Sequence, residues 1–388
     1  MLSQLDPASA LAVGFLIFSL LLVIAFEATN GFHDAANAVA TVIYTKSLQP
    51  PAAVLWSGFM NFVGVLVGGI SVAYALVEIL PPVLSPPSGA PAVAMLVALL
   101  SAALFWNIGT WWFALPNSSS HCLIGALIGI ALGNALLRAR SLSDGVHWGQ
   151  LWSVLQALAL SPVLGFVLSG ALYFILRRIA HDRHLYEPAK EGPPVWWMRG
   201  TLILTCTGVS VAHGTNDGQK SIGLIMLTII GLFPALFALN PMAADTIHNL
   251  PKLAAQATPL IQQYGDDEKA QALDAVQRLQ QGVPAPPRRV TFVAARESEP
   301  GLRSHEAKAR SGVRNDVHQL ISQLKHADEA RGIGADDKKK AKGLASQLGQ
   351  AVAYAPWWVR VRSALCLGIG TMVGYRTACC RASLSLGS

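Results

Sequence analysis

The chain has 388 residues, of which 52% are hydrophobic and only 13% are charged. Average soluble domains carry about 25% charged residues, so this composition argues against an ordinary soluble protein and favours a chain that lies mostly in lipid. The formal net charge is +7, but no basic stripe with interleaved aromatic residues occurs outside one polar segment, so we expect no nucleic-acid partner.

Long apolar runs in the first half predict membrane helices. The first run, residues 8–26, has no basic segment before it and no convincing cleavage site, so it predicts a retained helix rather than a cleaved signal. A bilayer-spanning helix needs roughly 20 apolar residues, and three further runs meet that length: 52–77, 90–113 and 151–176. Residues 122–137 form a shorter run after a polar turn, and with the preceding run they form either two full spans or a re-entrant hairpin.

The second half alternates between apolar and polar sequence. Residues 201–239 are apolar except at 213–220, which predicts two helical pieces around an interrupted centre that lines a cavity. Residues 241–350 hold 16 of the 29 Lys and Arg and 13 of the 22 Asp and Glu. Val317, Leu320, Ile321 and Leu324 follow a helical spacing there, so we predict a polar, partly helical insert that serves as a solvated connector or binds a partner.

These boundaries give a predicted domain organisation. Residues 1–240 form a transmembrane region, 241–350 the insert, 351–375 a last transmembrane helix and 376–388 an atypical tail. The short loop 177–200 is rich in Lys and Arg, which places it in the cytoplasm by the positive-inside tendency. The insert is expected on the same side, and the chain is expected to cross the plasma membrane of a bacterium several times.

Two related polar clusters, residues 31–38 and 214–221, interrupt the apolar sequence and align Asp34 with Asp217. An ionisable side chain at the centre of a membrane helix costs about 2.5 to 3.5 kcal/mol on insertion scales, so each needs a partner, a cavity or a role. An even number of crossings between the clusters would make their helices run in opposite directions. The pattern therefore predicts an inverted-repeat transporter, in which discontinuous helices meet at a central binding site.

The side chains of these clusters suggest ligands. Asp34 and Asp217, with Asn37 and Asn216, could hold a hard cation or a proton; the alternative is a pair of structural aspartates. Ser118, Ser119, Ser120 and His121 precede an apolar helix, whose free N–H groups favour an anion; the alternative is an ordinary helix cap.

Two further charged residues carry weaker signals. Lys220 is either a point charge for phosphate or an interfacial lysine. Glu27 is either a coupling carboxylate or a helix-end glutamate that meets water. The five cysteines show no metal-binding spacing and no disulfide framework, and no catalytic motif is convincing, so we predict neither a bound metal, nor a cofactor, nor an enzyme.

The motifs resemble those of the inorganic phosphate transporter family, specifically its bacterial low-affinity permeases. EATNGFHDAANAVATVIYT (27–45), LPNSSSH (115–121) and AHGTNDGQKSIG (212–223) carry the resemblance, which extends from about residue 11 to 375. Phe32, His33 and Thr215 depart from the family signatures. The resemblance implies an all-α, polytopic membrane protein that carries inorganic phosphate by symport with H+ or Na+, in bacterial members often as a complex with a divalent metal.

The resemblance also assigns roles. It implies phosphate or coupling-ion binding by Asp34, Asn37, Asn216 and Asp217 and a phosphate cage at 118–121. Family members continue after residue 374 into further spans and a second hairpin, so we expect a truncated or frameshifted product with an incomplete second repeat. The competing interpretations are an inactive transporter and a non-transporting membrane partner protein, and homo-oligomerisation stays open.

Overall fold

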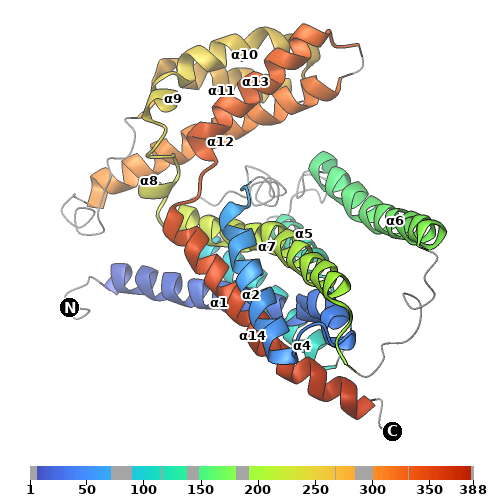
Figure 1. Ribbon diagram of the computed structural model, residues 1–388. Coiled ribbons are helices and arrows are strands. Elements are labelled where there is room, and N and C mark those ends of the chain that lie inside the picture. The colour runs from blue at the N-terminus through green and yellow to red at the C-terminus, as the bar shows by residue number, and fades with distance from the viewer. Residues whose placement is uncertain are drawn as a thin grey trace. The chain divides into compact units, whose positions relative to one another are not determined.

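The computed structural model describes residues 7–70, 90–113, 115, 117–137, 148–180, 192–266, 268–284, 300–330 and 332–385. Over these residues the chain is helical, with turns and irregular links and no strand (Figure 1). The helices are α1 (Pro7–Tyr44), α2 (Pro50–Val67), α4 (Ala90–Trp112), α5 (Ser119–Leu137), α6 (Trp148–Ile179), α7 (Trp196–Leu232), α8 (Pro234–Phe237), α9 (Ala244–His248), α10 (Leu250–Tyr264), α11 (Lys269–Gln281), α12 (Pro300–Glu329), α13 (Ala335–Val352) and α14 (Trp357–Ser385). The predicted all-α, polytopic fold is confirmed.

Four of the described segments are long and apolar enough to cross a bilayer: Pro50–Val67, Ala94–Trp112, Ser119–Leu137 and Leu151–Ile179. Among the described side chains of α6 only Leu151 is buried, and Figure 1 shows α6 apart from α2 and α14. Because α4 and α5 are each long enough to span, their length does not decide between two crossings and a re-entrant hairpin. The hairpin stays a prediction, as does the inverted orientation of the two repeats.

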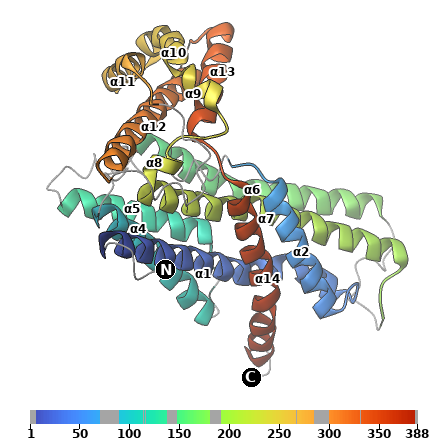
Figure 2. The same cartoon turned by 90° about the vertical axis from the view of Figure 1, so that its left-hand side faces the viewer.

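The prediction of discontinuous helices is wrong at both polar clusters. Helix α1 continues through residues 31–38 and α7 continues through 213–220 without a break (Figure 2). The described polar side chains find partners without breaking either helix, so the backbone keeps its own hydrogen bonds. Asp217 is contacted by three side chains of α7 itself and by Asn30 of α1, and His33 Nε2 lies 3.0 Å from the carbonyl oxygen of Asn107 on α4. The apolar run 52–77 also does not form one helix, because α2 ends at Val67 and residues 71–77 lie outside the described part.

The chain divides into two compact units. One comprises residues 1–21, 82–98 and 223–357, and the other comprises 22–81, 99–222 and 358–388. Most of α1 and α7, most of α4 and all but the first residue of α14 belong to the second unit, together with α2, α5 and α6. The domain boundaries expected from the sequence stay a prediction.

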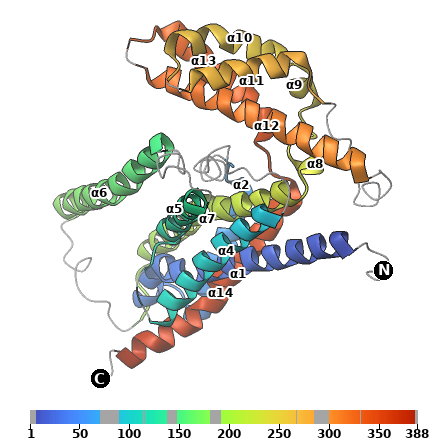
Figure 3. The same ribbon diagram turned by 180° about the vertical axis from the view of Figure 1, so that it is seen from behind.

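In the first unit, helices α9 to α13 surround an apolar core (Figure 3). Val317, Leu320, Ile321 and Leu324 of α12 are buried in that core, which confirms the helical pattern predicted for them. Arg314 joins the two ends of the insert, because its Nη1 donates to the carbonyl of Ala238 at 3.0 Å and to that of Val352 at 2.8 Å.

Close helix packing in the second unit depends on glycines without side chains. A Cβ at Gly214 would collide with the backbone carbonyl of Asn61, and a Cβ at Gly64 would collide with that of Val211. Helices α2 and α7 therefore approach until their backbones touch. A similar approach joins α1 to α14, where Gly370 lies against the backbone of Ala28.

Candidate functional site

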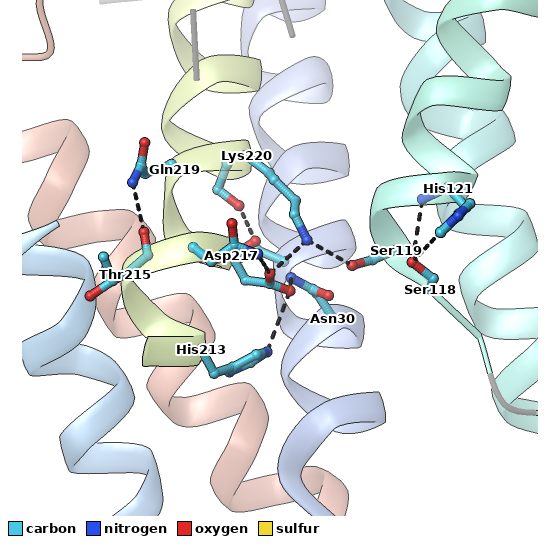
Figure 4. A network of polar contacts seen from close by, with 12 residues as sticks. Asn30, Ser118, Ser119, His121, His213, Thr215, Asp217, Gln219 and Lys220 are labelled. Carbon is cyan, nitrogen blue, oxygen red and sulfur yellow. Dashed lines mark hydrogen bonds and ion pairs between the residues drawn. The ribbon is translucent and has the colours of Figure 1, made fainter. Parts of the chain in front are cut away.

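A buried network of polar side chains lies within the second unit, on α1, α5 and α7 (Figure 4). At its centre is the carboxylate of Asp217, and both Asp217 and Lys220 are 4% exposed. The ammonium of Lys220 lies 2.6 Å from Asp217 Oδ1. Because both charges are removed from water, each depends on the other for neutralisation.

Three more side chains surround the same carboxylate. Asn216 donates to Oδ1 at 2.9 Å, Asn30 of α1 donates to Oδ2 at 3.0 Å, and His213 Nε2 lies 3.4 Å from Oδ2. A carboxylate offers about four lone-pair directions, so Asp217 has a neighbour for each. This saturation holds Asp217 in one position between α1 and α7.

Lys220 also connects the carboxylate to the start of α5. Its Nζ lies 3.3 Å from Ser119 Oγ, and Ser119 is the first residue of that helix and is buried. The first N–H groups of a helix have no partner within the helix and favour a negative charge. The ammonium of Lys220, the hydroxyl of Ser119 and the start of α5 together make a small region suited to an oxyanion.

The other members of the predicted serine cage point elsewhere. His121 Nδ1 lies 2.7 Å from Ser118 Oγ, and both residues are exposed. Figure 4 shows this pair turned away from Asp217, with only Ser119 directed at Lys220. Ser120 is half-buried. The structure thus brings one of the four predicted cage residues to the buried network.

The remaining predicted residues are placed as follows. Glu27 is 1% exposed and accepts a hydrogen bond from the hydroxyl of Ser221, which is itself fully buried. The alternative of a helix-end glutamate that meets water is therefore wrong, because Glu27 lies in the middle of α1. Asn37 is exposed, and the side chain of Asp34 lies outside the described part, so the predicted meeting of Asp34 with Asp217 is not tested.

Three members of the network were missed from the sequence: Asn30, His213 and Ser221. A signal for them exists in the helical spacing. On α1, Asn30 follows Glu27 by three residues. On α7, His213, Asp217 and Ser221 are spaced four residues apart. Residues three or four apart share a helix face, so a helical reading of each cluster would have included them.

Helix composition, apolar length and this buried charged network define an integral membrane protein with a polar site enclosed by its helices. The chain belongs to the phosphate transporter family, whose model matches residues 30–379. The resemblance predicted from the motifs is confirmed. Because the family and its named relatives are transporters, the expectation that the chain is not an enzyme is confirmed as well.

Individual relatives agree. The chain is 37% identical to the low-affinity inorganic phosphate transporter PitB of Escherichia coli K12 over 93% of this chain and 78% of that protein, and equally identical to PitA over the same shares. It is 36% identical to a probable low-affinity inorganic phosphate transporter of Bacillus subtilis over 55% of this chain. A solved structure, the sodium-dependent phosphate transporter, aligns with a TM-score of 0.46 at 15% identity over 94% of this chain and 89% of that one.

Proposed function

We propose that this chain carries inorganic phosphate across a bacterial plasma membrane by secondary transport, coupled to the movement of H+ or Na+. The family assignment supports phosphate as the substrate. The substrate would be phosphate alone or a complex of phosphate with a divalent metal. The insert would lie on the cytoplasmic side.

One observation carries the proposal: a buried ammonium bridges a carboxylate and the start of a helix. Lys220 reaches both Asp217 and Ser119, so a phosphate oxygen at the start of α5 would meet a positive charge, a hydroxyl donor and the positive end of the helix dipole. Charge-assisted hydrogen bonds of this type are about twice as strong as neutral ones. The opposite face of the ammonium stays held by Asp217, which keeps it in place as phosphate enters and leaves.

Uptake of labelled phosphate into proteoliposomes that contain the purified full chain tests the function. The wild-type chain should accumulate phosphate, and Ser119→Ala should lower the rate by about tenfold, the effect of losing one hydrogen bond to a charged group. Ser169→Ala is the control, because Ser169 is an exposed serine of α6 whose hydroxyl donates to the carbonyl of Phe166 in its own helix.

The two outcomes separate the competing functions. Equal rates for Ser119→Ala and Ser169→Ala would remove Ser119 from the site. No uptake by the wild-type chain in any cation gradient would favour the competing interpretations, an inactive transporter or a non-transporting membrane protein that acts through residues 241–350.

A further inference from the structure

The site buries two carboxyl groups whose surroundings differ sharply. Asp217 is surrounded by four nitrogen atoms, one of them the ammonium of Lys220. Glu27 receives a single hydrogen bond, from the hydroxyl of Ser221 to its Oε2. Its Oε1 is buried and has no hydrogen-bond partner among the described residues.

The charges near Glu27 do not supply it with a counter-ion of its own. The titratable groups that face it are Asp217, Lys220 and His213 of α7 and Cys366 of α14. Of these, Lys220 is in direct contact with Asp217, and His213 lies at the same carboxylate. A carboxylate that is buried without a dedicated cation gains stability by taking up a proton.

Burial also suits Glu27 to a coupled cycle. At 1% exposure, its carboxyl group exchanges protons with water only when the helices around it part. A coupling group must behave in this way, because a proton that entered and left freely would not be tied to the movement of phosphate. The hydroxyl of Ser221 can adapt to both states, since it donates to the ionised carboxylate and accepts from the protonated one.

We propose that Glu27, held by Ser221, takes up and releases the coupling proton, while the Asp217–Lys220 pair stays ionised throughout the cycle. The proton binds Glu27 from the side of higher proton concentration and leaves on the other side together with phosphate, so no covalent bond other than O–H forms or breaks. A sodium ion at Asp217 would have to displace Lys220. This inference rests on the proposed phosphate transport and names its coupling ion.

The test compares two assays on proteoliposomes that contain the full chain. The first measures phosphate accumulation driven by an imposed pH gradient, and the second measures exchange of internal for external phosphate at equal pH on both sides. Glu27→Gln mimics the protonated carboxyl group in shape. It should abolish accumulation, while phosphate exchange persists and changes less between pH 6 and pH 8 than exchange by the wild-type chain does, because only the titration of phosphate itself remains.

Ser221→Ala supplies an independent readout. Loss of a hydrogen bond to the ionised carboxylate should move the pH of half-maximal accumulation upward by about one to two units. Ser210→Ala is the matched control, because Ser210 is another fully buried serine of α7 but bonds to Ser57 of α2 at 2.8 Å. It should leave that pH unchanged.

Several results would overturn the inference. These are pH-driven accumulation by Glu27→Gln at the wild-type level, an unchanged pH profile of its exchange, or accumulation by the wild-type chain in a sodium gradient at equal pH. If Glu27→Gln loses both assays, Ser221→Ala decides, and a pH midpoint equal to that of Ser210→Ala would refute the role of Glu27. Failure of the wild-type chain in both assays would instead refute the proposed transport.

Discussion

Ion pairs differ in their exposure to water between the insert (residues 241–350) and the second compact unit, here called the membrane unit, which contains the buried polar network. In the insert, Arg278 forms an ion pair with Asp316 at 2.6 Å, but the arginine side chain is 52% exposed. The hydrogen bond to Asp316 raises the pKa of Arg278, and burial raises the pKa of Asp316 against the opposing effect of that arginine. In the membrane unit, Asp217 and Lys220 are both almost completely buried.

The comparison indicates in which part of the chain the folded state depends on charged pairs. Stability of the insert comes mainly from the apolar core of α9 to α13. In its pair of Arg278 with Asp316 the aspartate is buried, but water reaches the arginine and weakens the attraction. In the site, the two charges have little water and depend on each other. The insert should therefore tolerate the loss of a charge, whereas the site should not, and the following variants break or sharpen that contrast.

The largest effect is expected for Asp217→Asn, which leaves the buried ammonium of Lys220 without its counter-ion. Removing one partner of a buried pair costs about 3 to 5 kcal/mol, measurable as the free energy of unfolding in detergent micelles. The double variant Asp217→Asn with Lys220→Met removes both charges and should recover most of that loss. A single variant as stable as the double would contradict the mutual dependence of the two charges.

A smaller effect is expected for Gly214→Ala. The added Cβ collides with the backbone of Asn61 and should separate α2 from α7 at a cost of about 1 to 3 kcal/mol, with slower phosphate uptake. Gly208→Ala is the control on the same helix, because nothing lies within 4 Å of its Cβ position. Equal thermal stability of the two variants would show that the helices are not in backbone contact.

The smallest effect is expected for the pH dependence of the stability of the insert, through His318. Burial, with the charges of Arg314 and Lys325, lowers the pKa of His318 well below its usual range. In the unfolded chain this histidine takes up a proton near pH 6.5, whereas in the folded insert it stays neutral. Stability of the insert should therefore fall as the pH drops below about 6.5, by at most about 1.4 kcal/mol per pH unit.

Hydrogen exchange of α12 in the full chain, compared at pH 7.5 and pH 5.5, measures this effect. His318→Leu should remove the histidine's share of the pH dependence. The same pH dependence in the variant and in the wild-type chain would assign it to other groups.

Features set by residues close together in the sequence were predicted correctly, whereas contacts between residues far apart in the sequence were not. Apolar length predicts α4, α5 and α6 well, and the spacing of Val317, Leu320, Ile321 and Leu324 predicts the buried face of α12, because these signals are local. The bonds from Asn30 to Asp217 and from Ser221 to Glu27 join residues 187 and 194 positions apart. Local spacing can mark such residues as members of a polar face, but it does not indicate which helices pack together, so these pairings could not be predicted.

The discontinuous helices illustrate the same limit. The two polar clusters were interpreted as breaks in the helices because a polar side chain in lipid needs a hydrogen-bonding partner. Backbone carbonyl groups exposed at a helix break are one possible partner. In the structure, side chains of the same helix and of a neighbouring helix supply partners to Asp217 instead, so the backbone of α1 and of α7 stays helical through both clusters.

Phosphate binding to the purified chain in micelles tests the central claim most directly. The double variant Asp217→Asn with Lys220→Met is expected to fold but lacks the ammonium that faces Ser119, so its affinity for labelled phosphate should fall by about tenfold or more. Lys252→Met, at an exposed lysine of α10, should bind as the wild-type chain does. A folded double variant with wild-type affinity would contradict the assignment of Lys220 to the phosphate site.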